Sequence, residues 1–331
     1  AFIFLMAYLF VSFFTFFWVE KFFTRNIADL RPLFESMPVL MIFLVSTITM
    51  RMWSEEKKSG TVEFLMTLPV KTWELVLGKF LSCFVLVLLA LSLTLFLPAS
   101  ISVMSGGALD WGPVWGGYFA SLLLASSYIA IGLFISSKTE SQIISLILTS
   151  FVCLIFYFIG SRTIVGLLGS VEGEFLKLLS SGGRFESISR GVMDLRDIYY
   201  YLSLTAVFLV LNIFSLEKSQ WSLSGDIETH RAKFLVMGAL VLNILFANLW
   251  LHGVSFLRID TTEKKIYSIS EASKKVLLRL EEPLLIRGYI SERTHPLLAP
   301  LVPLVTDLLG EYQLVNQDLI ILKKYIGPLD L

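Results

Sequence analysis

Long, almost uniformly apolar stretches constrain this chain more than any other feature. About 20 consecutive apolar residues span the hydrocarbon layer of a membrane as a helix. Only 16% of all residues are charged, against roughly 25% in soluble domains. We read seven spans from the sequence, at about 1–19, 37–53, 75–104, 111–137, 141–161, 198–216 and 234–251. The sequence therefore predicts a mainly α-helical integral membrane protein.

Charge and cysteine content exclude several other classes of protein. Lys plus Arg and Asp plus Glu both number 27, so the net charge is zero and no basic excess points to nucleic acid. Both cysteines, Cys83 and Cys153, lie inside apolar runs. We interpret them as small hydrophobic residues rather than as part of a disulfide or metal framework.

Motifs of catalysis are missing from the sequence. A P-loop requires G-x-x-x-x-G-K-[ST], and the one Gly-Lys pair, Gly78-Lys79, is followed by Phe80. The histidines are scattered over separate segments, and neither G-x-S-x-G nor H-E-x-x-H occurs. We therefore expect no enzyme activity, no metal site and no cofactor on this chain.

The polar content of the spans disfavours a secondary transporter. Ion-coupled transporters place ionisable residues at membrane depth, because these carry the coupled charge. Apart from Arg51, at the end of the second span, the only charged residue in the predicted spans is Lys79, near one end, where its side chain can reach the interface. Their other polar residues are mainly serines and threonines, which typically pack helices closely; a role for some of them in a substrate path is the alternative.

The charged strip 51–80 lies between two apolar runs. Gly60 and Pro69 bound a helix of at most two turns, 61–68, in which Val62, Leu65 and Met66 form one apolar stripe. The residues predict a short amphipathic helix beside the membrane, or a solvated loop that only joins two spans. Lys and Arg do not decide which side the strip occupies, because eight fall on each side of the predicted spans.

The sequence EEKKSGTVEFLMTLPVKTWELVLGKF, residues 55–80, resembles the loop between the second and third spans of type-2 ABC exporter permeases. In that family the loop is a cytoplasmic coupling helix that docks on a separate ATP-binding subunit. The resemblance implies two such ATPase subunits, which hold ATP and Mg, and a homodimer of the permease. It also implies that the loop is cytoplasmic and that its ATPase-coupling residues are Glu55, Gly60, Thr61, Glu63, Phe64, Leu65 and Pro69.

A second stretch, residues 183–221, resembles the end of gliding-motility-associated (GldF-like) ABC permeases. On this resemblance, residues 1–221 form a six-helix permease domain, and the segment that begins FESISRGVMDLRD lies outside the membrane. Just upstream, Phe175, Leu178 and Leu179 recur with helical spacing, which predicts amphipathic pieces on the outer surface.

The composition changes after residue 221. Residues 222–254 are interpreted as a linker with the seventh span, and 255–331 as a small extracytoplasmic α/β domain. In that domain Ser270 is expected to cap a helix over 271–282, 300–313 to form a second helix, and 284–290 and 318–326 to form strands. The segment from Lys233 onward resembles the start of gliding-motility auxiliary (GldG-like) proteins. We expect residues to be missing at the start of the chain and an incomplete domain at its end.

The sequence as a whole predicts a permease of an ATP-driven type-2 ABC exporter, fused to an auxiliary domain, in a bacterial cytoplasmic membrane. Two alternatives stay open. One is a scaffold that transmits ATPase-driven change to the outer domain without transport, and the other is a secondary transporter. Nothing in the sequence selects a substrate among lipid, polysaccharide, peptide and small molecule.

Overall fold

The computed structural model describes residues 2–20, 22–25, 29–107, 109–161, 179–219, 227–252, 258–262, 270–280, 282–291 and 320–327, with a few isolated positions between them. The chain divides into two compact units. The first comprises Ala1–Glu20 and Ala28–Ile259, and the second comprises Lys21–Ile27 and Asp260–Leu331.

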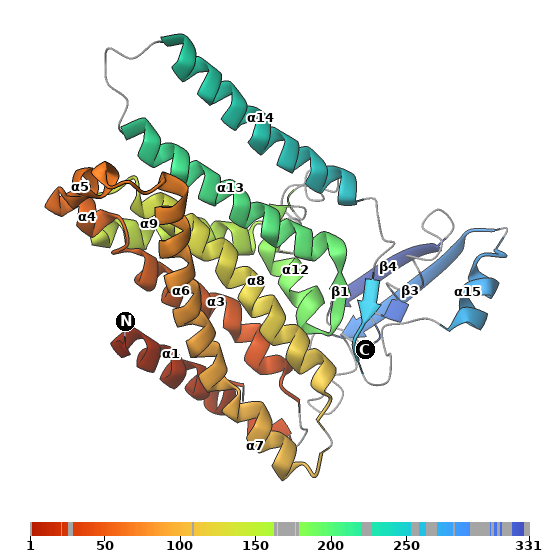
Figure 1. The fold of residues 1–331 in the computed structure, drawn as a ribbon. Coiled ribbons are helices and arrows are strands. Elements are labelled where there is room, and N and C mark those ends of the chain that lie inside the picture. The colour runs from red at the N-terminus through yellow and green to blue at the C-terminus, as the bar shows by residue number, and fades with distance from the viewer. Residues whose placement is uncertain are drawn as a thin grey trace. The chain divides into compact units, whose positions relative to one another are not determined.

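The first unit is a bundle of long apolar helices (Figure 1). Five helical segments are long and apolar enough to cross a membrane: Phe2–Val19, Arg31–Ser59, Thr72–Met104, Trp111–Ser136 and Leu195–Lys218. Among the described residues, Gln142–Phe158 and Phe234–Asn248 are shorter apolar helices. All seven predicted spans therefore fall on helices, and five of them meet the length expected of a membrane span. The helices of the bundle are α1 (Phe2–Phe14), α3 (Arg31–Thr49), α6 (Thr72–Thr94), α8 (Trp111–Ser136), α9 (Gln142–Phe158), α13 (Leu195–Ser219) and α14 (Ile227–His252).

The helix boundaries differ from the predicted ones by a few residues at several ends, most clearly at the starts of α3 and α14. The second span was predicted to begin near Met37, but α3 begins at Arg31. Pro32 lies in its first turn, where the missing N–H breaks no helical hydrogen bond. The first span ends in a π-helical turn, η1 (Thr15–Val19). A kink-prone proline, Pro38, lies inside α3 and obscures its start in the sequence.

Helix α8 is the centre of the bundle, and most of its side chains are buried. Glycines let its neighbours approach closely. A Cβ atom at Gly117 would lie 2.5 Å from the ring of Phe34, and one at Gly132 would overlap Thr49. Both contacts join α8 to α3, so small residues determine how these two helices pack.

The serines and threonines of the spans are mostly buried within the chain. Ser127 Oγ of α8 donates a hydrogen bond of 3.1 Å to the backbone oxygen of Tyr201 on α13. Ser137 Oγ, just beyond α8, donates one of 3.2 Å to Ser215 Oγ. On α14, Asn248 Nδ2 donates a hydrogen bond of 2.8 Å to Ser203 Oγ. These contacts favour the helix-packing interpretation of the hydroxyl residues, and they hold α14 against α13.

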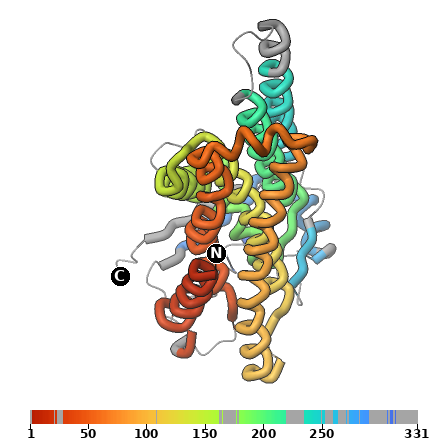
Figure 2. The backbone as a smooth tube through the Cα atoms, turned by 60° about the vertical axis from the view of Figure 1, so that its left-hand side comes forward, coloured from red at the N-terminus to blue at the C-terminus, as the bar shows by residue number. Residues whose placement is uncertain are grey.

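Short elements lie at the two ends of the bundle (Figures 1 and 2). Two helices, α4 (Ser54–Ser59) and α5 (Thr61–Thr67), follow α3 at one end. At the opposite end, α7 (Phe96–Met104) continues α6. Also away from α5, α12 (Ser181–Ser189) and strand β1 (Val192–Asp194) precede α13.

The second unit contains a parallel pair of strands. β3 (Leu284–Ser291) pairs with β4 (Ile320–Gly327), with Leu284 opposite Ile320 and Ser291 opposite Gly327. Both strands were predicted, and Ser270 caps α15 (Glu271–Leu277) by accepting a hydrogen bond from Ser273 N. The helix was predicted to reach residue 282 and ends five residues earlier. The remaining short elements are α2 (Phe22–Arg25) and β2 (Arg258–Asp260).

Several predictions lie outside the described residues. Phe175 and Leu178, and most of the helix predicted over 300–313, are among them. The domain boundaries at 221 and 254 and a complete α/β domain after residue 255 stay predictions.

Candidate functional site

The charged strip folds as two short helices joined at Gly60. This glycine has a φ of +73°, in the left-handed region, and its N–H closes the end of α4 by donating to Lys57 O. Helix α5 ends at Thr67, because Leu68 is extended before Pro69. The short helix predicted over 61–68 is confirmed, with its end one residue earlier.

The two sides of α5 differ in exposure. Val62 is buried, and Leu65 and Met66 are half-buried, so the predicted apolar stripe lies on the less exposed side. Phe64 is 67% exposed, and Glu63 is also exposed. A large exposed aromatic side chain beside an exposed carboxylate is a typical anchor for a protein partner.

Lys79 of α6 joins the strip to the bundle. Its Nζ lies 2.5 Å from Glu56 Oε2 in α4 and 4.0 Å from the ring centroid of Trp53, and it donates a hydrogen bond to the backbone oxygen of Met52. From the sequence, Lys79 is interpreted only as a lysine near the interface. Its three contacts instead bind the start of α6 to the segment that precedes α5.

Ser136, at the end of α8, holds the same segment from another side. The backbone N–H groups of Trp53 and Ser54 both donate to Ser136 Oγ at 3.1 Å. Ser136 Oγ in turn donates to Met50 O at 3.3 Å, and the Trp53 side chain is fully buried. The segment between α3 and α4 is therefore fixed to both α6 and α8.

Lysines from three elements gather at this end of the bundle. Partial desolvation lowers the pKa of Lys138, which follows α8, and the positive charges of Lys218 at the end of α13 and Lys57 in α4 lower it further. The sequence analysis counted these residues as separate loop charges.

The other predicted coupling residues lie along the same strip. Glu55 in α4, Thr61 at the start of α5 and Pro69 after it are all exposed. The structure thus brings all seven predicted residues into one short region, while Leu65 is less accessible than Phe64. Their role in coupling to an ATPase stays a prediction.

Little else in the described residues indicates catalysis or metal binding. Cys83 and Cys153 are buried free thiols, and no group of three His, Cys, Asp or Glu side chains that can hold a metal ion occurs in the described part of the chain.

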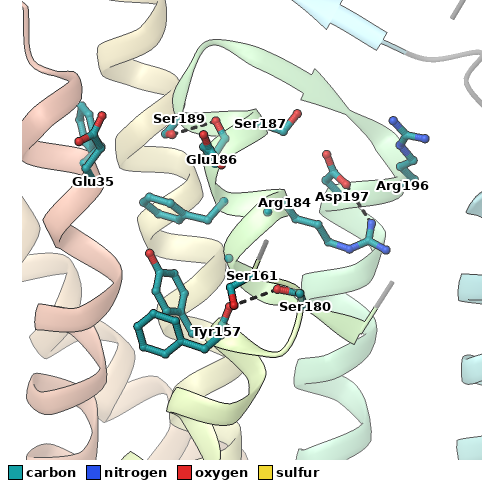
Figure 3. Close-up of a pocket in the computed structure, with 16 residues that line it drawn as sticks. Glu35, Tyr157, Ser161, Ser180, Arg184, Glu186, Ser187, Ser189, Arg196 and Asp197 are labelled. Atoms are coloured by element: carbon teal, nitrogen blue, oxygen red, sulfur yellow. Dashed lines mark hydrogen bonds and ion pairs between the residues drawn. The ribbon is translucent and has the colours of Figure 1, made fainter. Parts of the chain in front are cut away.

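The end of the bundle away from α5 holds a pocket of about 630 Å³ (Figure 3). It lies among the start of α3, the end of α9, helix α12 and the start of α13. Its lining includes the aromatic residues Phe34, Tyr157, Phe158 and Phe185. A volume of this size falls in the range of small-molecule sites.

Ion pairs organise the polar wall of this pocket. Arg184 Nη1 lies 2.9 Å from Asp197 Oδ1, and its guanidinium lies 4.4 Å from the ring centroid of Tyr200. Arg196 Nε lies 2.7 Å from Asp194 Oδ2. These residues were not predicted as a site; the signal available was the alternation of arginine with glutamate or aspartate within 184–197.

Two family models match different parts of the chain. Residues 263–328 match a domain of unknown function (DUF7088). No curated protein and no solved structure matches the chain. Residues 5–260 match the model of the ABC-2 family transporter protein, which covers more than half of the chain. Permeases of this family are transmembrane components that generally work with an ATP-binding subunit. This multi-pass membrane protein therefore belongs to the ABC-2 transporter family.

Proposed function

We propose that the chain is the permease subunit of an ATP-driven type-2 ABC exporter and that α4 and α5 form its contact with the ATPase. Two observations together support this proposal: one side of α5 is exposed to solvent, and the segment before α5 is bonded to the helix bundle. Phe64 and Glu63 face solvent, whereas the segment before them is bonded to α6 through Lys79 and to α8 through Ser136.

This arrangement has a mechanical consequence. A partner that moves α5 also moves Trp53 and Glu56, and Lys79 transmits the displacement directly to α6. A solvated loop that only joins two spans needs none of these contacts. The ATPase then drives transport by binding two permease conformations with different affinity.

The proposed ATPase contact also implies an orientation in the membrane and a subunit composition. Docking on an ATPase places α4 and α5 in the cytoplasm, so the pocket beside α12 opens toward the opposite side. With the spans crossing as predicted, the C-terminal segment is extracytoplasmic. Two permease chains with two ATPase subunits, which bind ATP and Mg, complete the transporter. The match over 5–260 supports the permease role, and membership of the gliding-motility-associated group is the finer proposal from sequence resemblance.

Substitution of Phe64 tests the docking side. Because the Phe64 side chain is largely exposed, Phe64→Ala is expected to leave thermal stability within about 0.5 kcal/mol of the parent. At a docking contact, loss of such an aromatic anchor weakens binding by about 2 kcal/mol or more, roughly 30-fold. The measurement is co-purification of a P-loop ATPase with the tagged full chain in mild detergent, together with ATPase activity.

Val62→Ala is the matched control, because Val62 lies on the buried side of the same helix. It is expected to lower stability by about 1 kcal/mol and to retain the ATPase in the folded fraction. A folded parent protein that recovers no ATPase would exclude the proposal. Recovery that does not depend on Phe64 would move the docking contact away from α5. An ATPase that is retained and stimulated by ligands, with no substrate moved, would favour the scaffold alternative.

A further inference from the structure

We propose that the pocket between α3, α9, α12 and α13 is a binding site for a neutral, hydroxyl-rich ligand of the size of one or two sugar rings. The site is separate from the ATPase contact, because it lies at the other end of the bundle. Only the side of the membrane to which it opens rests on the proposed function. Its 630 Å³ accommodate such a ligand.

The charges of the pocket argue against an anionic or cationic ligand. Arg184 is paired with Asp197, Arg196 with Asp194, and Arg190 forms an ion pair with Glu186. An anion would have to compete with these carboxylates, and breaking a partly buried ion pair leaves an uncompensated charge. A neutral ligand leaves every pair in place.

The hydrogen-bonding groups of the pocket favour hydroxyls. A guanidinium has five N–H donors and a carboxylate has about four acceptor positions. Arg196 is ion-paired through Nε and Asp197 through Oδ1, so each group has further hydrogen-bonding capacity. Serine hydroxyls line the pocket as well, among them Ser161 and Ser187 (Figure 3). Donors and acceptors thus occur in the same wall, and a hydroxyl group both donates and accepts at a single position.

The aromatic residues supply the remaining part of the site. Tyr157 and Phe158 form an edge-to-face pair with ring centroids 4.8 Å apart, and Phe34 of α3 lies in the same lining. Apolar ring faces beside hydrogen-bonding groups match the amphipathic character of a sugar ring, which has C–H faces and hydroxyl edges. A purely apolar ligand would cover the remaining hydrogen-bond donors and acceptors of this wall without supplying partners for them.

Of two neighbouring glycines in the pocket lining, only Gly183 allows the pocket to be filled without disturbing the fold. A Cβ atom at Gly182 would lie 2.7 Å from Tyr157 O, so this position is closed. At Gly183 a Cβ atom meets nothing within 4 Å, and the residue lines the pocket. Gly183→Leu is therefore expected to fold normally and to place its side chain in the ligand space.

The experiment is saturation-transfer NMR on the purified full chain in detergent, without ATPase or nucleotide. The probes are glucose, N-acetylglucosamine and maltose at about 10 mM, compared with glucuronate, glucose 1-phosphate and glucosamine at the same concentration. The neutral saccharides are expected to give transfer signals that Gly183→Leu abolishes. Gly238→Leu in α14, where added atoms also meet open space, is the matched control and is expected to retain them.

A second variant keeps the test valid if Gly183→Leu does not fold. Tyr157→Ala is expected to weaken binding of the neutral saccharide about tenfold, with the thermal unfolding midpoint of every variant measured in parallel. Absence of transfer to all neutral probes would overturn the proposal, and so would equal transfer in Gly183→Leu. Preferential binding of the charged probes would overturn the ligand class. None of these outcomes depends on whether an ATPase co-purifies.

Discussion

At the residue scale, a single lysine changes the interpretation of the strip 51–80. In the sequence, Lys79 is a charge near the end of an apolar run. In the structure its ammonium group contacts a carboxylate, an indole ring and a backbone oxygen, all from the segment 52–56. Its spacing of 23 to 27 residues from these partners produces no periodic signal. Pairing over such a distance becomes visible only when two helices are placed side by side.

Removal of this lysine is the first prediction. Lys79→Met keeps the apolar stem but leaves Glu56 without its cation, so we expect a loss of about 1–3 kcal/mol in the attachment of α4. The measurement is limited digestion with trypsin in detergent, scored as cleavage after Lys57 and Lys58, which should become faster. Lys58→Met changes an exposed lysine of the same strip, and the rate after Lys57 should then stay as in the parent. Equal rates in Lys79→Met and the parent would contradict the attachment.

The second residue-scale prediction concerns Lys138. Partial desolvation, and then Lys218 and Lys57, lower its pKa from the ordinary value, so a larger fraction of its amine is uncharged at a given pH. Acylation of Lys138 by an amine-reactive reagent should therefore begin at lower pH in the folded chain than in the denatured chain. Lys57→Gln removes a repelling charge and should raise the pKa of Lys138, shifting its labelling curve to higher pH.

Peptide mass spectrometry of the labelled folded and denatured samples measures the acylation of Lys138. The direction of the Lys138 pKa shift can also be checked through the pH dependence of stability. Because the folded-state pKa of Lys138 is lowered, the unfolded chain binds more protons between the folded and unfolded pKa values, and this residue's contribution to stability rises with pH across that window. A labelling curve for Lys138 that does not move in Lys57→Gln would contradict the proximity of the lysines.

At the element scale, glycines decide two different kinds of geometry. Gly60 provides a left-handed turn between α4 and α5, whereas Gly117 and Gly132 let α8 approach α3. The sequence predicts the first use, because a glycine before a short capped run marks a turn. It does not predict the second, because which face of α8 meets α3 depends on how several helices pack together.

The turn at Gly60 leads to the third prediction. Gly60→Ala adds a Cβ atom in the left-handed region, at a cost of about 1–2 kcal/mol. The direction of α5 should change, and co-purification of the ATPase should fall. Gly78→Ala is the matched substitution within helix α6, where nothing lies within 4 Å of the added atom; it should be neutral or stabilising by up to about 1 kcal/mol. Similar ATPase recovery from both variants would show that the turn is not needed for docking.

At the scale of the whole molecule, the spans differ in burial, because α8 and α3 lie at the centre of the bundle. The buried share of the most apolar window is 83% in Trp111–Ser136 and 67% in Arg31–Ser59, whereas it is 22% in Phe2–Val19. All three are similarly apolar in sequence, because lipid and a protein core both accept apolar side chains. Hydropathy therefore predicts that these segments span the membrane, and packing decides which of them form the core.

The fourth prediction tests orientation. Cys83 and Cys153 are fully buried, so they should react little with a membrane-impermeant maleimide. In intact cells Ser187→Cys, near the pocket, and Tyr289→Cys, in β3, should be labelled, whereas Lys58→Cys should react only after permeabilisation. Labelling of Lys58→Cys in intact cells would reverse the proposed orientation, and protection of Tyr289→Cys alone would place the C-terminal segment inside.

The sequence by itself determined the class of this protein and the approximate positions of its helices. Apolar run length and the breakers Gly60 and Pro69 are local signals, and so is the Ser270 cap. Tertiary structure alone decided the partners of Lys79, the closeness of Lys57, Lys138 and Lys218, and the pocket walled by Arg184 and Asp197. These features join residues from different helices. Their geometry depends on how the helices pack, and no local pattern records that packing.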